Sequence, residues 1–267
     1  MMKCQTVMDM LERLAPKKMA EDWDNPGLLV GSPKQDVGKL LVCLDVTEEV
    51  VMEAVYNHCD MIISHHPVIF KGMKKLRTDL YQGRLFQKLL INNIAVFSAH
   101  TNLDAAVGGV NDVLARAAGL ERIRAFDSDS SRPMEETVGR IGYLPEPMTI
   151  DEFAAKLKAG LGAEYVRVVR AGDKIIRKVA LCSGAGAEFI SRAAFLGADC
   201  YITGDVKYHD AQLARENEIH VIDGGHFPTE FPVVKVLAEL ISAKAEEAGE
   251  RLEIICDTAS RDVFEVI

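Results

Sequence analysis

The sequence lacks the segments that would direct a protein into or across a membrane. No window approaches the roughly 20 apolar residues of a membrane-spanning helix, and residues 1–6 contain no apolar signal core. The six cysteines are scattered, with no Cys-x-x-Cys pair, which is typical of small buried residues in a reducing compartment. These absences predict a cytoplasmic protein with no membrane partner.

An excess of basic residues is also missing. The chain has 31 Lys and Arg against 40 Asp and Glu, and its net charge is −9. Proteins that bind nucleic acid present a basic face to the phosphates, so this balance argues against that class. We therefore expect no nucleic-acid partner.

Several motifs of common enzyme classes are absent. There is no Gly-x-x-x-x-Gly-Lys phosphate loop and no Gly-x-Ser-x-Gly nucleophile turn. Gly184-Ala185-Gly186 follows an expected strand, but the third glycine of a dinucleotide-binding turn is not in register. No nucleotide cofactor is expected.

The sequence does contain an alternation of strands and helices, which is the pattern of an α/β fold. Continuous apolar runs indicate strands covered on both faces, and a Thr149–Glu152 capping box indicates a helix start. The expected strands are 28–30, 40–44, 61–64, 94–98, 138–144, 165–169, 178–182, 200–203, 219–222, 252–256 and 263–266. A long helix is expected from about Thr229.

The chain divides at a charged, serine-bearing stretch near residues 122–136, which we interpret as a linker. It separates a first α/β domain, 1–125, from a second, 137–267, with the alternative that the last strands of the second pack back on the first. Residues 40–66 align without a gap with 179–205, and the two segments share five identities, including Cys43 with Cys182. We therefore expect two related α/β units from an internal duplication. Each would be a mainly parallel sheet with helices on both faces, and a cleft between the units would hold the functional site.

Two adjacent histidines, His65 and His66, end the apolar strand 61–64, and Pro67 follows them. Proline removes a backbone donor and keeps the preceding residue extended. Neighbouring side chains of an extended segment point to opposite sides. One ion is therefore hard to chelate with both rings, and the pair predicts the first half of a dinuclear metal site. The alternative is that the histidines are structural.

More polar side chains follow other expected strands. Asp45, His100 and Asp104 lie at or just past strand ends, where α/β sheets bind their ligands. His226 and Glu230 are four residues apart across a helix start, a spacing that lets both reach one point. A capped helix is the alternative for this pair.

The complete candidate ligand set mixes imidazoles with carboxylates, a combination that suits Zn, Fe, Mn or Ni better than Ca or Mg alone. We predict two divalent transition-metal ions per chain. The ligands would be His65, His66, Asp104, His226 and Glu230.

Other polar residues are candidates for proton transfer or substrate contact. His100 is one, and Asp205 and His209 lie at a second strand-to-helix turn. For Asp205 and His209 the alternative is a helix cap with surface charges. His58 and His220 are expected to be structural or surface residues. Trp23 is expected to pack within a turn, with the alternative that Trp23-Asp24-Asn25 edges the cleft.

Four motifs, taken together, resemble the GTP cyclohydrolase I type 2 homologues, also called Nif-three-like or interacting-factor-three-like proteins. They are Ser64-His65-His66-Pro67, Thr101–Asp104 with Gly108–Asp112, Thr203–Asp205 with Lys207–His209, and Gly225-His226 with Thr229-Glu230. The resemblance implies a two-domain α/β fold, a dinuclear metal site on the five ligands above with Glu230 as a bridge, and a ring-shaped homohexamer. It also implies a short form, without the domain that many members carry between the two halves.

Two functions follow from these expectations. The first is a metal-dependent hydrolase, cyclohydrolase-like by resemblance, that acts on a small nucleotide-like or heterocyclic substrate. The second is a non-catalytic metal-binding protein, such as a metal chaperone or regulatory scaffold. The two differ in whether the metal keeps an open coordination position.

Overall fold

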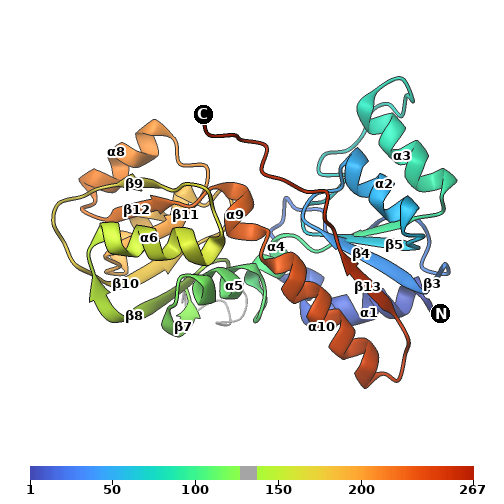
Figure 1. The fold of residues 1–267 in the computed structure, drawn as a ribbon, viewed down its shortest axis with the longest axis horizontal. Coiled ribbons are helices and arrows are strands. Elements are labelled where there is room, and N and C mark those ends of the chain that lie inside the picture. Colours follow the sequence, from blue (N-terminus) through green and yellow to red (C-terminus); the bar gives the residue numbers. More distant parts are fainter. Residues whose placement is uncertain (127–136) are drawn as a thin grey trace. The chain divides into compact units, whose positions relative to one another are not determined.

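The computed structural model describes residues 1–126 and 137–267, in which the chain forms two compact units (Figure 1). The first unit comprises Met1–Ala106 and Val233–Arg261, and the second comprises Val107–Pro232 and Asp262–Ile267. The α-helix and strand that end the described fold, α10 (Val233–Glu247) and β13 (Glu253–Cys256), thus belong to the first unit.

The first unit is built on a five-stranded sheet with the order β13-β4-β5-β6-β2. Strands β13, β4, β5 and β6 are parallel to one another, and β2 pairs antiparallel with β6 at the edge. The bounds of the last four are β2 (Gly27–Val30), β4 (Lys39–Cys43), β5 (Met61–Ser64) and β6 (Ala95–Ser98). The carboxyl ends of β4, β5 and β6 therefore lie at one edge, just before Asp45, His65 and His100.

Helices cover both faces of this sheet (Figure 1). The helices α2 (Glu48–Tyr56) and α3 (Tyr81–Ile91) pack on Leu41, Ile62 and Val96 on one face. On the other side lie α1 (Cys4–Leu14) and α10. The smaller elements are β1 (Met2–Lys3), η1 (Lys17–Met19), β3 (Asp36–Val37) and α4 (Thr101–Ala105).

The second unit has a six-stranded sheet with the order β7-β8-β10-β11-β12-β9. Only its central strands β10, β11 and β12 are parallel, and three of its pairings are antiparallel. This corrects the expectation of a mainly parallel sheet, because β7, β8 and β9 join the parallel centre as antiparallel neighbours on either side. The bounds are β7 (Glu121–Ala125), β8 (Arg140–Met148), β9 (Arg167–Val169), β10 (Ile176–Leu181), β11 (Cys200–Thr203) and β12 (His220–Asp223).

Helices also cover both faces of the second sheet. The helices α5 (Val110–Ala117) and α6 (Ile150–Leu161) pack against Val179, Ile202 and Ile222 on one face. The other face is covered by α7 (Ile190–Phe195) and α8 (Tyr208–Glu216), with η2 (Ala187–Phe189) ahead of α7. The Thr149–Glu152 capping box at the start of α6 is confirmed.

Three sequence-based expectations about elements were wrong. Residues 263–266 form no strand; Val263 and Phe264 are largely exposed, and a strand needs a hydrogen-bonded neighbour. The long helix after Gly225 is two helices, α9 (His226–Glu230) and α10, because Pro232 lacks the N–H that would continue the first. The predicted linker begins inside β7, and its remainder falls mainly on residues 127–136, outside the described residues.

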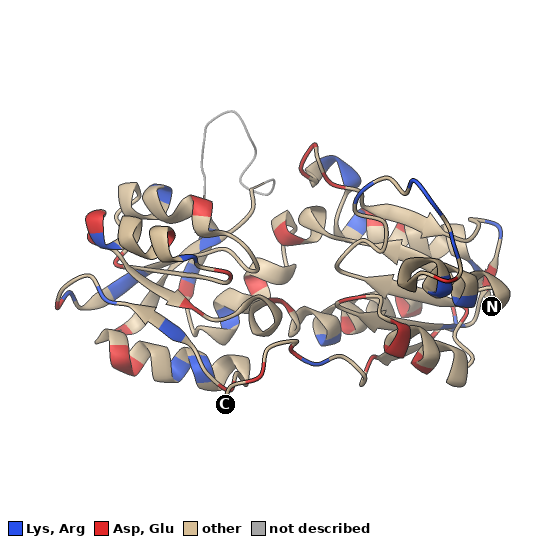
Figure 2. Cartoon of the chain, turned by 90° about the horizontal axis from the view of Figure 1, so that it is seen from above, with Lys and Arg blue, Asp and Glu red and all other residues tan. Residues whose placement is uncertain are grey.

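Charged residues of both signs are interspersed over the helices and loops of each unit (Figure 2). None of the helices in residues 1–126 and 137–267 combines the length and hydrophobicity that spanning a bilayer requires.

Candidate metal centre

The backbone of the histidine pair leaves the strand geometry that the sequence predicted. The N–H groups of His65 and His66 both donate to the segment at the end of β4. They bind the carbonyl oxygens of Cys43 and Leu44, respectively. In an extended strand, consecutive N–H groups point to opposite sides. The chain has therefore already turned, and the two rings lie with centroids 5.0 Å apart. The expectation that the rings point to opposite sides was wrong.

His65 is completely buried and is held by two groups of its own unit. Its Nδ1 donates to the carbonyl oxygen of Ala99 at 2.9 Å. Because a carbonyl can only accept, this contact fixes the proton on Nδ1, and in the neutral ring Nε2 carries the lone pair that binds metals. That Nε2 lies 3.6 Å from the Oδ1 of Asp104, which sits on the short helix α4.

His66 is partly exposed and uses the same nitrogen for support. Its Nδ1 lies 2.7 Å from the Oδ1 of Asp45, the residue after the end of β4. A carboxylate accepts this proton, orients the ring and makes Nε2 a better ligand. Asp45 was predicted at this edge of the sheet, but its support of His66 was not.

His100 is anchored in the same way by Asp24. Its Nδ1 donates to Asp24 Oδ1 at 2.7 Å, and the Thr101 backbone N–H donates to Asp24 Oδ2 at 3.0 Å. Burial alone would raise the pKa of Asp24, but the hydrogen bonds from His100 and Thr101 outweigh it and hold the pKa at about 2. Asp24 is therefore ionised. Sequence reasoning missed its role, because nothing in a turn 76 residues away points to His100.

The rings of His65, His66 and His100 form one cluster in the first unit. The centroid of His100 lies 5.2 Å from that of His65 and 5.6 Å from that of His66. One ring nitrogen from each of the three lies within 4.8 Å of the others, so the group could hold a metal ion. His100, predicted only as a proton-transfer residue, thus stands among the candidate ligands.

Two exposed aromatic rings lie beside this cluster. Trp23 and Phe70 have centroids 6.0 and 6.1 Å from that of His100 and 5.8 Å from each other. The side-chain amide of Asn25 donates to the carbonyl of Ile69 at 2.6 Å, which ties the two loops together. Trp23 is 60% exposed, so the expectation of a packed tryptophan was wrong.

The second unit presents His226 and Glu230 on α9. Gly225, with a φ of 82° that favours glycine, turns the chain into this helix. His226 Nε2 lies 3.1 Å from Glu230 Oε2, and His226 Nδ1 donates to Asp205 Oδ2 at 2.8 Å. Asp205 follows β11 with a left-handed φ of 54°, a conformation that Asp tolerates better than most residues. It supports the histidine much as Asp45 supports His66.

Glycines at the ends of β10 and β11 make room for the Glu230 carboxylate and for the turn into α9. A Cβ on Gly184 would stand 2.1 Å from Glu230 Oε1 and 3.2 Å from His226 Nε2. A Cβ on Gly204 would stand 2.8 Å from the His226 backbone nitrogen. Of the two glycines in Gly184-Ala185-Gly186, Gly184 thus makes room for Glu230, whereas a Cβ on Gly186 would meet Cys182, Thr203 and Tyr201.

Two histidines of the second unit stand apart from these groups. His220 is buried, accepts from the Ala171 N–H at 3.1 Å and donates from Nε2 to the Lys174 carbonyl at 3.1 Å, so the backbone uses both nitrogens. His209 is exposed on α8, where its Nδ1 contacts Gln212 Oε1 at 2.9 Å and its ring packs on Tyr208. Neither arrangement is that of a ligand.

Comparison with known proteins places the chain in a family. Residues 2–262 match the model of Duf34/NIF3 (NGG1p interacting factor 3). The chain belongs to the NIF3 family. A NIF3-family relative from Clostridium perfringens, named GTP cyclohydrolase 1 type 2 homolog, is 35% identical over 266 residues and covers all of both chains.

Other NIF3-family proteins show the fold and a longer form. The crystal structure of a Bacillus cereus protein related to NIF3 has a TM-score of 0.93 at 27% identity, with 100% of this chain and 99% of that chain covered. A relative from Halalkalibacterium halodurans, also named GTP cyclohydrolase 1 type 2 homolog, aligns at 28% identity over 371 residues, and the alignment covers 98% of each chain. Because this chain has 267 residues, that relative contains a segment that this chain lacks.

The side chains of this NIF3-family protein fit a transition metal in their donor chemistry. His65, His66 and His100 of the first unit and His226 of the second each have Nδ1 within 2.9 Å of a carboxylate or carbonyl oxygen, so the lone pair of the neutral ring lies on Nε2. Carboxylates of Asp104 and Glu230 lie next to two of these Nε2 atoms. Imidazole with carboxylate is a donor set for Zn, Fe, Mn or Ni.

Proposed function

We propose that this NIF3-family protein is a metal-dependent hydrolase of a small nucleotide-like or heterocyclic substrate. The observation that carries the proposal is the shared support of the histidines, each held at Nδ1 by a fixed acceptor. Surface histidines have no need of such anchors, whereas metal ligands almost always have them.

The proposed site holds two divalent transition-metal ions per chain. The ligands would be His65, His66 and Asp104 from the first unit and His226 and Glu230 from the second. Zn, Fe, Mn or Ni fits this mixture of nitrogen and oxygen donors. When bound, such a pair activates water and stabilises negative charge on the substrate.

His100 is the residue we assign to proton transfer. Asp24 keeps the proton on its Nδ1, so His100 exchanges protons with the substrate or water through Nε2. Asp205 supports His226 and is better described as a positioning residue than as a proton donor. In the part of the chain that the structure describes, the His209 ring contacts Tyr208 and Gln212, and we assign it at most a contact with bound substrate.

The aromatic rings beside His100 support a planar substrate. Trp23 and Phe70 are exposed side by side, and rings of this kind stack on the flat faces of heterocycles. The name of the Clostridium perfringens relative, GTP cyclohydrolase 1 type 2 homolog, points to a nucleotide of this chemistry. Trp23→Ala is expected to raise KM about tenfold or more, since stacking contributes roughly 1–3 kcal/mol per base, with little change in metal content.

We also infer the assembly from family membership, and the cellular setting from the scattered cysteines and the acidic net charge. The protein is proposed to be cytoplasmic and to form a homohexamer, with no nucleic-acid or membrane partner. The ungapped alignment of residues 40–66 with 179–205 supports an origin of the two units by duplication. Size-exclusion chromatography with light scattering tests the hexamer.

A second candidate function is a non-catalytic metal-binding or regulatory scaffold protein. It is favoured by the burial of His65 and Glu230, which are 0% and 4% exposed, because structural metal sites tend to be closed to water. A hydrolase needs a coordination position open to water and substrate.

Metal analysis of untagged protein, purified without chelators, tests both functions. We expect about two metal equivalents per chain, with a sharp fall in His66→Ala and Glu230→Ala while circular dichroism remains that of the parent. Full metal content in either variant would contradict the ligand assignment. If the loaded protein hydrolyses no member of a panel of nucleotides and heterocycles, the scaffold function becomes the better one.

A further inference from the structure

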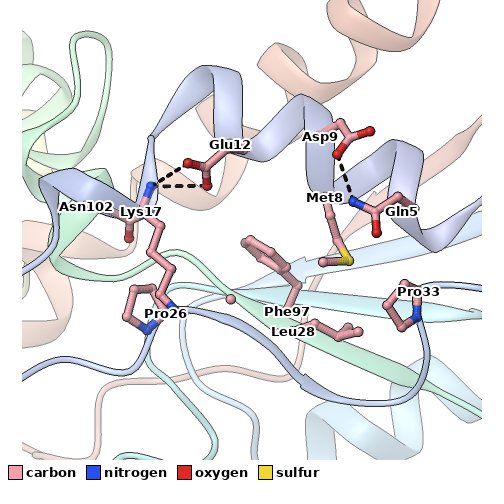
Figure 3. A pocket seen from close by; sticks show the side chains of 11 residues that line it. Gln5, Met8, Asp9, Glu12, Lys17, Pro26, Leu28, Pro33, Phe97 and Asn102 are labelled. Atoms are coloured by element: carbon pink, nitrogen blue, oxygen red, sulfur yellow. Dashed lines mark hydrogen bonds between the residues drawn. The ribbon is translucent and has the colours of Figure 1, made fainter.

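A pocket within the first unit is lined by residues other than the clustered histidines (Figure 3). It has a volume of about 430 Å³, within the usual range for small-molecule sites. Helix α1 forms one wall, and β2 with β6 forms the floor. None of the candidate metal ligands lines it, so an inference from this pocket is independent of the proposed function.

The centre of the pocket is apolar. Phe97 and Leu28 are cross-strand partners of β6 and β2, so their side chains emerge on the same face of the sheet. Met8 faces them from α1 (Figure 3). An aromatic or branched aliphatic group is the ligand part that such a surface takes, because it removes apolar area from water on both sides.

One end of the pocket carries charges of both signs. Figure 3 shows Glu12 and Lys17 at this end, with the Lys17 side chain extending towards Pro26. The Lys17 ammonium lies 4.0 Å from the position of a Cβ on Gly27, and no ion pair is formed by it within the described residues. The Glu12 carboxylate accepts only the Lys17 backbone N–H, at 3.0 and 3.1 Å, so both oxygens retain acceptor capacity.

The wall next to these charges is rigid. Asn102 donates its side-chain amide to the Ala15 carbonyl at 2.7 Å and accepts from the His100 N–H at 2.9 Å. At the other end, the Gln5 side chain donates to Asp9 at 2.8 Å, so that carboxylate already has a partner. The polar pair that remains for a ligand is Lys17 with Glu12.

We propose that this pocket binds a zwitterionic α-amino acid with a large apolar side chain. The ligand carboxylate pairs with the Lys17 ammonium, and its ammonium pairs with the Glu12 carboxylate. The side chain lies between Met8 and the Phe97–Leu28 surface. A ligand with one charge would leave either Lys17 or Glu12 without its pairing.

Calorimetric titration with L-tryptophan tests the pocket, with tryptamine and indole-3-propionate as probes that lack the carboxylate and the ammonium, respectively. We expect L-tryptophan to bind and each single-charge probe to bind about tenfold more weakly, since a charge-assisted hydrogen bond contributes roughly 1.5–3 kcal/mol. Absence of L-tryptophan binding overturns the proposal. Equal binding of either single-charge probe overturns the zwitterion assignment.

Substitutions of the lining residues test whether L-tryptophan binds in this pocket. Lys17→Gln and Glu12→Gln are expected to weaken L-tryptophan binding by about tenfold, and Leu28→Trp to abolish it by filling the apolar centre. Lys18→Gln is the matched control, because Lys18 is adjacent in sequence and does not line the pocket. Unchanged thermal midpoints show that each variant is folded. Equal weakening in Lys18→Gln, or undiminished binding in Lys17→Gln, contradicts the assignment.

Discussion

The two units equip the carboxyl ends of their parallel strands differently. After β5 and β6, the first unit places three imidazoles whose Nδ1 atoms are held by Ala99, Asp45 and Asp24. After β10 and β11, the second unit places glycines, and the chemistry comes from a histidine and a glutamate on the short helix α9. The first unit thus carries histidines directly after β5 and β6, whereas the second leaves space after β10 and β11 for the side chains of α9.

The difference shows that, in an α/β protein, the sheet topology fixes where the loops lie but not which loop carries the polar side chains. Parallel strands bring loops to one edge regardless of their sequence. Which loop carries the polar groups depends on local detail, such as the left-handed φ of Asp205 and Gly225. In the aligned register, His65-His66 correspond to Gly204-Asp205, so an equivalent position holds a candidate ligand in one unit and a positioning residue in the other.

The largest expected effect is a loss of metal on substitution of His66, in contrast to substitution of the buried His220. His66→Ala should lower metal affinity by more than about a hundredfold, because it removes a ligand rather than a supporting group. His220→Ala should leave metal content unchanged but lower the free energy of unfolding by about 2–4 kcal/mol, since two buried hydrogen bonds are lost. Metal analysis and urea unfolding of both variants check this. Loss of metal in His220→Ala, with full metal content in His66→Ala, would contradict both assignments.

The need for a glycine beside Glu230 in the second unit can be tested by adding a side chain at position 184. In Gly184→Ala the new Cβ would meet Glu230 Oε1 at 2.1 Å, so we expect a displaced carboxylate and a loss of metal affinity approaching a hundredfold. Gly162→Ala is the matched control, because Gly162 has a similar φ of 62° and nothing within 4 Å. We expect the control substitution to lower the free energy of unfolding by about 1 kcal/mol and to leave the metal content unchanged. Similar metal content in the two variants would show that the space around Glu230 is unimportant.

A smaller effect is expected from the carboxylates that support the histidines. Asp45→Asn and Asp205→Asn keep an acceptor but remove its charge, so metal affinity should fall by about tenfold in each. Competition with a chromogenic chelator measures both. If only one variant loses affinity, the two units support their histidines differently after all.

The smallest effect concerns the pH dependence of folding. The pKa of Asp24 is lowered from 3.8 to about 2, so the ionised carboxylate stabilises the fold above pH 3.8, and this contribution is lost as the pH falls towards 2. Asp24→Asn should therefore lower the free energy of unfolding by about 1–2 kcal/mol at neutral pH. The difference from the parent should shrink below pH 4 in urea titrations. A difference independent of pH would mean that Asp24 acts through packing rather than charge.

The sequence by itself determined the order of elements and the residues that end the central strands. Buried strands such as 61–64 and 94–98 are readable because both faces are apolar, and His65-His66-Pro67 marks a strand end by composition alone. The family was also recognisable from motifs spread over the chain, and the match over residues 2–262 confirms it.

Tertiary structure alone decided which residues support the site and which strands join each sheet. Asp24 meets His100 across 76 residues, and Asp205 meets His226 across 21, distances at which no local pattern operates. The antiparallel strands β7, β8 and β9 joined the second sheet because edge pairing depends on which neighbour the folded chain offers. The direction of the His65 and His66 rings depended on a turn fixed by hydrogen bonds to Cys43 and Leu44, which belong to another strand end.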